Sequence, residues 1–152
     1  MTIIAALRAA VPADADLSYI VDDLRPLVVP IDSIQLDPAN ARVHPDQNRQ
    51  VIGGSLKRFQ QRKPLVVNTR DGAFVVEAGN GTLEEARAHG WQYIAVVGVD
   101  DAPVEARAFG LIDNRSAELA EWSPDLADLL TRARDEDEED LEPLGWTAEQ
   151  VE

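Results

Sequence analysis

One stretch in the middle of the chain constrains the fold most, because it contains two strand-like segments, a turn and a glycine-rich helix start. Leu65-Val66-Val67-Asn68 and Ala73-Phe74-Val75-Val76-Glu77 are short apolar runs of the kind that form buried strands. Thr69-Arg70-Asp71-Gly72 between them is typical of a hairpin turn. The pattern therefore predicts a hairpin whose second strand continues through Ala78-Gly79-Asn80-Gly81-Thr82 into a helix that ends at Gly90.

The rest of the chain also alternates between strand-like and helix-like segments. Thr82 and Glu85 have capping-box spacing, and Asp101 can cap a later helix that has Pro103 in its first turn. A helix after Ser123-Pro124 would turn its leucines inward. In that helix the leucines expected to face inward are Leu126, Leu129 and Leu130. The other expected elements are an edge strand at 28–31, a helix over 46–61 and a strand at 93–97. We therefore expect a compact α/β (α+β) domain with a small mixed sheet and surrounding helices.

Charge and composition limit the function classes. The 152 residues carry a net charge of −14, and seven acidic residues between Asp135 and Glu142 supply half of it. An acidic chain is poorly suited to unspecific DNA binding, so direct DNA binding is not expected without a partner. The absence of cysteine excludes thiolate chemistry and disulfides. With no membrane-length apolar stretch and no charged signal region at the start, we expect a cytoplasmic protein.

We expect three parts along the chain. Residues 1–27 would form an N-terminal arm, residues 28–134 the domain, and residues 135–152 an acidic linker with a short C-terminal segment. The acidic part and Trp146 either dock a basic partner or form a flexible solvated tail. The oligomeric state is not indicated by the sequence. A basic cluster forms either a local patch or one solvated helix face: Arg49, Lys57, Arg58, Arg62 and Lys63.

The glycine turn at Gly79-Asn80-Gly81-Thr82 is the best candidate for a binding site. A helix N-terminus presents unpaired N–H groups and the positive end of its dipole, and glycines let the backbone approach a bulky anion. Together they form a cradle for phosphate. The spacing alone fits any tight turn into a capped helix equally well. His44 and His89 are not spaced as metal ligands.

Five motifs occur in order along the sequence. They are Pro30-Ile31-Asp32-Ser33-Ile34, Ile52-Gly53-Gly54-Ser55-Leu56, Lys63-Pro64-Leu65-Val66-Val67, Glu77-Ala78-Gly79-Asn80-Gly81-Thr82-Leu83 and Ile112-Asp113-Asn114-Arg115. This succession resembles the ParB N-terminal domain family over about residues 28–131, with the closer likeness to its phage and methyltransferase-associated branch. The resemblance implies a ParB/sulfiredoxin-like fold that binds the phosphates of a nucleoside triphosphate, CTP or ATP, at the glycine turn.

The resemblance also assigns roles to particular positions. In partition ParB proteins the glycine that Gly79 matches is followed by Glu-Arg-Arg, whose arginines hold phosphate, but here Asn80, Gly81 and Thr82 follow. The resemblance therefore implies a backbone cradle without two cationic groups. Asn80 also stands where sulfiredoxins have their cysteine, which excludes sulfinic-acid reduction.

A second family motif, Glu-Asn-x-x-Arg, helps to hold Mg²⁺ and phosphate. Asp113 and Asn114 match its first two positions, and Arg115 follows at once instead of two residues later. Oxygen ligands of this kind suit Mg²⁺, which binds through few protein groups plus phosphate. The alternative is a polar helix end, with Asn114 near the cap and Arg115 solvated. Glu77, just before the turn, is the better candidate for a general base, although a strand-end Glu is also commonly solvated.

These observations lead to one main hypothesis and two alternatives. The main hypothesis is a stand-alone nucleotide-phosphate-binding module in DNA maintenance, DNA modification or a phage-borne system, in a bacterial or phage-infected cell, that acts through a protein partner. The first alternative is a Mg²⁺-dependent nucleotide hydrolase, small-molecule kinase or nuclease on the same fold. The second is a degenerate protein-interaction scaffold that binds no nucleotide.

Overall fold

The fold is built around a five-stranded mixed sheet, which confirms the expected α/β class. The computed structural model describes residues 3–137 and 139–151. The strand order is β1-β5-β3-β4-β2, with β3 antiparallel to β4 and parallel to β5. The strands are β1 (Val28–Pro30), β2 (Ile34–Gln35), β3 (Leu65–Arg70), β4 (Ala73–Ala78) and β5 (Tyr93–Val99). As Pro30 predicts, β1 lies at an edge of the sheet.

The central hairpin forms as expected, with a tighter turn. Arg70 pairs with Ala73, so β3 and β4 are joined by only Asp71 and Gly72. Both residues have positive φ, 49° and 81°, which is the backbone of a type I′ turn. Gly72 adopts this conformation without steric cost, and the turn sets the register that carries Glu77 to the end of β4.

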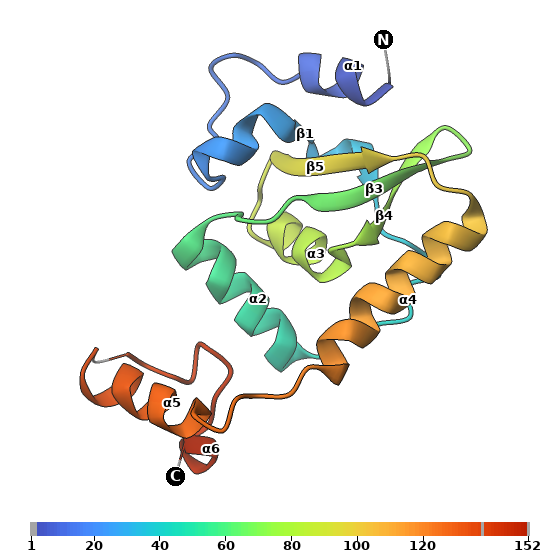
Figure 1. Ribbon diagram of the computed structural model, residues 1–152. Coiled ribbons are helices and arrows are strands. Elements are labelled where there is room, and N and C mark those ends of the chain that lie inside the picture. The colour runs from blue at the N-terminus through green and yellow to red at the C-terminus, as the bar shows by residue number, and fades with distance from the viewer. Residues whose placement is uncertain (1–2, 138, 152) are drawn as a thin grey trace.

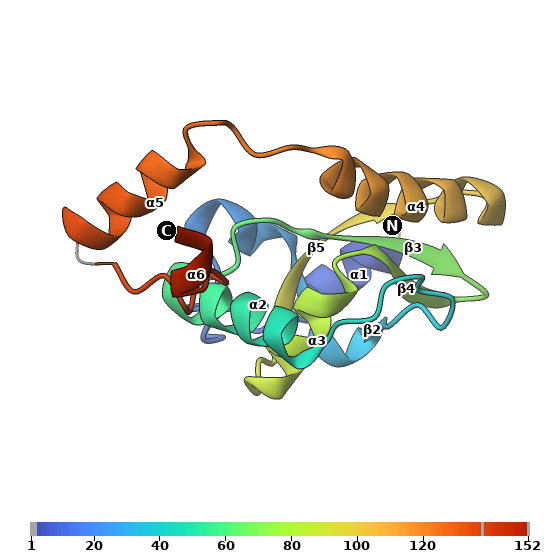
Figure 2. The same cartoon turned by 90° about the horizontal axis from the view of Figure 1, so that it is seen from below.

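The described residues form six helices, which are α1 (Ile3–Ala9), α2 (Asp46–Phe59), α3 (Asn80–Ala88), α4 (Pro103–Leu119), α5 (Leu126–Asp135) and α6 (Ala148–Val151). Short 3-10 turns occupy Asp22–Leu27 and Ile31–Ser33. Helices α2 and α3 lie side by side, while α5 and α6 lie beyond α2, away from the sheet (Figures 1 and 2). None of the helices in the described ranges is long and apolar enough to cross a membrane.

The main core lies between the strands and α3. Its fully buried side chains include Val29, Val67, Val76, Leu83, Ile94 and Val96. Gln61 is buried among them. Its side-chain amide donates to the carbonyls of Lys63 and Ala95 and accepts from the N–H of Ala95, so a side chain takes the place of a neighbouring strand at this point of β5. Residues before β1 contribute as well, because Ile4 and Leu7 pack against this core and Ile20 is fully buried.

Two predicted helix starts are wrong in detail. Helix α3 begins at Asn80 with Gly79 as its N-cap, and Glu85 pairs with Arg49 at 2.7 Å instead of closing a capping box on Thr82. Asp101 does not cap α4, because the N-cap residue is Ala102 and no side chain caps this helix. The backbone N–H and C=O of Asp101 are bonded to the side chain of Asn68.

The chain after α4 forms a small second cluster. Leu130 and Leu141 are buried there, with Leu126 and Trp146 packed against them. Leu129 is 56% exposed, so its expected inward orientation is wrong. The acidic stretch contacts the domain through Glu139, whose carboxylate forms an ion pair with Arg58 on α2.

Candidate phosphate-binding site

A cavity of about 160 Å³ lies at the N-terminus of α3. Its walls come from four separate segments: the loop before α2, one side chain of α2, the end of β4 with the start of α3, and the middle of α4. The lining residues are Asn40, Arg42, His44, Ile52, Glu77, Ala78, Gly79, Asn80, Gly81, Thr82, Asp113 and Asn114. Every candidate residue of the glycine turn therefore lines one cavity, together with Glu77, Asp113 and Asn114.

The floor of the cavity is the backbone turn at Gly79. Its φ of +103° is a left-handed conformation, and a Cβ there would collide with Leu65. The turn directs the chain from β4 into α3, where the first backbone N–H groups have no partner within the helix. No acidic residue occupies the first turn of α3, so nothing on this helix competes with an anion for those groups.

Gly81 lets His44 and Ile52 lie close to the backbone at the start of α3. A Cβ at Gly81 would lie 2.8 Å from Cε1 of His44 and 2.9 Å from Cδ1 of Ile52. His44 is held in place because its Nδ1 donates to Oδ1 of Asn48 at 2.7 Å. The glycine therefore permits the close approach of the loop before α2 to the helix start.

Asn80 has a structural role in the turn. Its side-chain Oδ1 accepts a hydrogen bond from the backbone N–H of Asp37 at 3.0 Å, and the residue is 7% exposed. Asp37 in turn pairs with Arg70 at 3.2 Å. These contacts fix the loop that carries Asn40, Arg42 and His44 against the start of α3.

Glu77 is a buried carboxylate beside the cavity. Its side chain is fully buried, and neither of its oxygens has a hydrogen-bond partner among the described residues. Arg70 Nη2 lies 3.8 Å away. Burial raises the pKa of the Glu77 carboxyl above its ordinary value of 4.5, and the neighbouring Asn68 and Arg70 oppose this only in part. A carboxylate in this state is suited to accept a proton or a cation.

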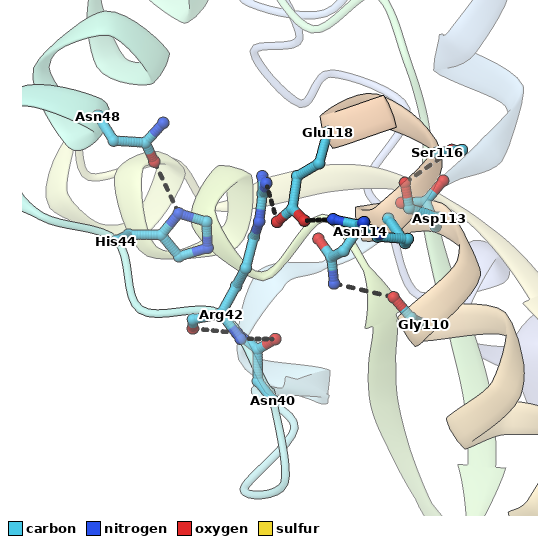
Figure 3. Close-up of polar contacts among 10 residues, drawn as sticks. Asn40, Arg42, His44, Asn48, Gly110, Asp113, Asn114, Ser116 and Glu118 are labelled. Atoms are coloured by element: carbon cyan, nitrogen blue, oxygen red, sulfur yellow. Dashed lines mark hydrogen bonds and ion pairs between the residues drawn. The ribbon is translucent and has the colours of Figure 1, made fainter. Parts of the chain in front are cut away.

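Helix α4 brings part of the second motif to the same place. Asp113 and Asn114 line the cavity, and Asn114 does not lie at a helix end, because α4 continues to Leu119; the part of that alternative that places Arg115 in solvent is confirmed. The Asn114 amide donates to the carbonyl of Gly110 at 2.8 Å, which leaves its Oδ1 available (Figure 3). Arg115 is not among the lining residues; its side chain is 64% exposed and pairs with Glu118 at 3.1 Å.

Arg42 and His44 were missed by the sequence analysis. Figure 3 shows Arg42 reaching from the loop before α2 to Glu118 on α4, where the ion pair measures 3.2 Å. The signal that could have found them is the polar run Asn40-Ala41-Arg42-Val43-His44 directly after the turn at Asp37–Asn40. The alternation of polar and apolar residues in this run also fits a short strand, but the structure has no helix or strand there, and loops commonly carry functional side chains.

The donor set fits Mg²⁺ only together with a phosphate ligand. No group of three or more acidic, histidine or cysteine side chains in the described residues could hold a metal ion by itself. If Mg²⁺ bound here, Asp113 and the free oxygen of Asn114 would be the two oxygen ligands from protein, which is the number that Mg²⁺ commonly takes when phosphates supply the rest.

Comparison with solved structures identifies the fold. The chain superposes on the C-terminally truncated chromosome-partitioning protein ParB from Caulobacter crescentus complexed with CTP-gamma-S, with a TM-score of 0.66 and 16% identity. The match covers 82% of this chain and 73% of that chain. The chain has the ParB/sulfiredoxin-like fold.

The chain is also similar to two further solved structures. The same Caulobacter crescentus protein, complexed to the centromeric parS site, gives a TM-score of 0.50 at 16% identity, over 82% of this chain and 67% of that chain. Sulfiredoxin from Arabidopsis thaliana gives 0.44 at 21% identity, over 55% of this chain and 97% of that chain. No protein-family model and no curated protein matches the sequence.

Proposed function

We propose that this chain is a ParB-like nucleotide-phosphate-binding module, in which the start of α3 holds the phosphates of a nucleoside triphosphate with Mg²⁺. The observation that carries the proposal is the convergence of Gly79–Thr82, Asp113 and Asn114 on one cavity, although 30 residues separate the two motifs. Free backbone N–H groups at a helix start and oxygen ligands on the facing helix are the two components that a Mg²⁺–phosphate group needs.

The charges of the cavity make the cation necessary. Glu77 and Asp113 are acidic, and Arg42 is the only lysine or arginine that lines the cavity among the described residues. A polyphosphate alone would be repelled by the two carboxyl groups, and Mg²⁺ would neutralise part of its charge. Binding is therefore expected to depend strongly on the divalent ion.

The proposal also covers the nucleobase of the bound nucleotide and the cellular role of the protein. A solved structure of this fold was obtained with CTP-gamma-S, which makes CTP the first nucleotide to test and ATP the second. We propose a role in DNA maintenance, DNA modification or a phage-borne system, in the cytoplasm of a bacterial or phage-infected cell. A protein partner is supported by the exposed apolar side chains of α4 and its C-terminal extension, namely Val104, Leu111, Ile112, Leu119 and Trp122.

Two substitutions of Thr82 with opposite charge test the site. Thr82 is the third residue of α3 and lines the cavity. Thr82→Glu suits the helix dipole and leaves the fold intact, but it places a negative charge where phosphate would bind. Thr82→Arg restores one of the two missing cationic groups. Calorimetric titration with CTP, ATP, GTP and UTP, with and without Mg²⁺, should show weaker binding to Thr82→Glu and tighter binding to Thr82→Arg than to the wild type.

The enzymatic alternative is favoured by Glu77. Its raised pKa and buried, unpartnered carboxylate are properties of general bases. Nucleotide hydrolysis by the wild type that is lost in Glu77→Gln, with nucleotide affinity retained, would establish this role. The scaffold alternative predicts that no nucleotide binds and that the two Thr82 variants behave like the wild type.

A further inference from the structure

We propose that Trp122 and Trp146 are positioning residues for the candidate phosphate site, an inference that rests on the proposed function. They join the chain just after α4 to residues 139–147, which we call the strap. The strap also contacts α2, and α2 and α4 contribute to two different walls of the cavity. The docked strap holds these walls together, and its release lowers the affinity for phosphate.

The strap lies along one face of α2 (Figure 2). Its contacts fall on Val51, Gly54 and Arg58, which share one side of the helix because they are three and four residues apart. A Cβ on Gly145 would lie 3.2 Å from Cγ2 of Val51, and one on Gly54 would lie 4.0 Å from a backbone oxygen of the strap. Arg58 Nη2 donates to Oε2 of Glu139 at 2.7 Å. Small residues and an ion pair therefore seat the strap on α2.

The other end of this connection is a pair of indole rings. Trp122 and Trp146 meet edge to face, with centroids 5.2 Å apart and ring planes at 67°. Trp146 packs against the small cluster of Leu130 and Leu141, whereas Trp122 is 72% exposed. The contact is therefore of modest strength, and the strap can release Trp122 without unfolding the domain.

Helix α4 depends on such a contact for its position. Its buried residue, Ala106, lies in the first turn, and beyond the midpoint of the helix every residue except Asn114 is exposed. This half carries Asp113, and Glu118 joins it to the loop before α2 through an ion pair with Arg42. Because exposed ion pairs contribute little, the contact at Trp122 helps to decide where this half lies.

The strap also lies behind the wall that contains His44. Asn48 on α2 forms the hydrogen bond of 2.7 Å that holds His44 at the cavity. Asn48 and Val51 line a groove of about 780 Å³ beside the strap, and Trp122 and Trp146 line the same groove. One groove thus connects the residues that position both walls.

The test is calorimetric titration of inorganic triphosphate with Mg²⁺ into the wild type and variants whose folding is checked by circular dichroism. Trp122→Ala and Trp146→Ala should each weaken binding by about three- to tenfold, the range that one aromatic pair can supply. Trp146→Phe keeps an aromatic ring and should restore most of the affinity. Because the two rings form one contact, the double variant Trp122→Ala/Trp146→Ala should bind no more weakly than the weaker single variant.

Leu119→Ala is the matched control. It removes an apolar side chain that is 63% exposed from the same end of α4, and its affinity should stay within about twofold of the wild type.

Amide hydrogen exchange measures the positioning without relying on affinity. Without ligand, residues 113–119 should exchange faster in Trp122→Ala than in Leu119→Ala, because a less firmly held segment opens more often. Coupling between two sites is reciprocal, so triphosphate with Mg²⁺ should slow exchange at residues 139–147 in the wild type and not in Trp122→Ala.

Equal affinities of Trp122→Ala and Leu119→Ala would overturn the inference, while triphosphate binding by the wild type would leave the proposed function standing. Additive losses in the double variant would also overturn it, because Trp146 would then act without Trp122. A flat wild-type titration would overturn the proposed function and the inference with it.

Discussion

The side-chain oxygen of Asn80 lies 3.0 Å from the backbone nitrogen of Asp37 and accepts its hydrogen bond. This contact joins the first residue of α3 to a loop 43 residues earlier in the sequence. Asn80 thus holds the two halves of the cavity together, and its loss would separate Arg42 from the helix start.

We predict that Asn80→Ala destabilises the fold by about 1–2 kcal/mol, because the buried acceptor is lost and the N–H of Asp37 is left without its partner. Asn80→Asp keeps an acceptor at the same position and suits the helix dipole, so it should retain most of the wild-type stability. Urea unfolding of the three proteins gives the comparison. Equal losses in the two variants would show that the contact does not stabilise the fold.

Gln61 offers a second test of the fold, independent of the cavity. Its amide makes the hydrogen bonds to Ala95 that neighbouring backbone does not supply, and Gln61 is 1% exposed. Gln61→Leu should lower the free energy of unfolding by about 3 kcal/mol, because it leaves the buried groups of Ala95 unsatisfied. The control is Gln50→Leu on the exposed surface of α2, which should change stability little. A similar loss in both variants would contradict this account of Gln61.

The buried carboxyl of Glu77 makes stability depend on pH in a definite direction. Its folded pKa is raised above 4.5, so the folded state binds more protons than the unfolded state at pH values between the unfolded and the folded pKa. Stability from this group is therefore lost as pH rises above about 4.5. Glu77→Gln removes this cost and should be more stable than the wild type at pH 7, with the difference vanishing toward pH 4.

Chemical unfolding across this pH range measures the effect. The control is Glu121→Gln, at an exposed position, which should show no such pH-dependent gain. A Glu77→Gln protein that is less stable than the wild type at pH 7 would mean that the ionised carboxylate has stabilising contacts.

Local patterns predicted most of the fold but not the contacts between distant segments. The hairpin, the edge position of β1 and a helix after the glycine turn follow from short-range sequence signals, and the structure contains all of them, although the helix starts earlier than the capping box at Thr82 predicts. Leu129 was placed wrongly because helix periodicity does not tell which partners α5 has, and the small cluster around Leu130 leaves Leu129 in solvent.

In the candidate site, too, sequence motifs indicated some of the residues, and the others depend on contacts between distant segments. Gly79, Asp113 and Asn114 were found through motifs. The position of Arg42, in contrast, depends on the bond between Asp37 and Asn80 and on the ion pair of Arg42 with Glu118, which connect the loop, α3 and α4. No periodic pattern encodes such tertiary contacts. The predicted cap at Asp101 is wrong for a similar reason, since α4 has Ala102 as its N-cap and the backbone of Asp101 is bonded to Asn68, 33 residues away.

The C-terminal segment should respond to salt. Glu139 binds Arg58 through both carboxylate oxygens, and Arg58 holds the pKa of Glu139 below its ordinary value. Glu139→Gln should loosen the segment and speed its proteolysis relative to Glu142→Gln, a charge-matched change at an exposed position. High salt should reduce the difference, because it screens exposed pairs. Equal cleavage rates at low salt would show that this ion pair does not hold the segment.

The central claim is that the backbone at the start of α3 binds nucleotide phosphates. The most direct measurement is the change in backbone amide chemical shifts by NMR when Mg²⁺ and CTP, and separately Mg²⁺ and ATP, are added to the wild-type chain. We predict that the largest changes fall on Asn80, Gly81 and Thr82, with smaller changes at Arg42 and Asn114. Largest changes elsewhere, or no saturable change at any amide, would contradict the claim.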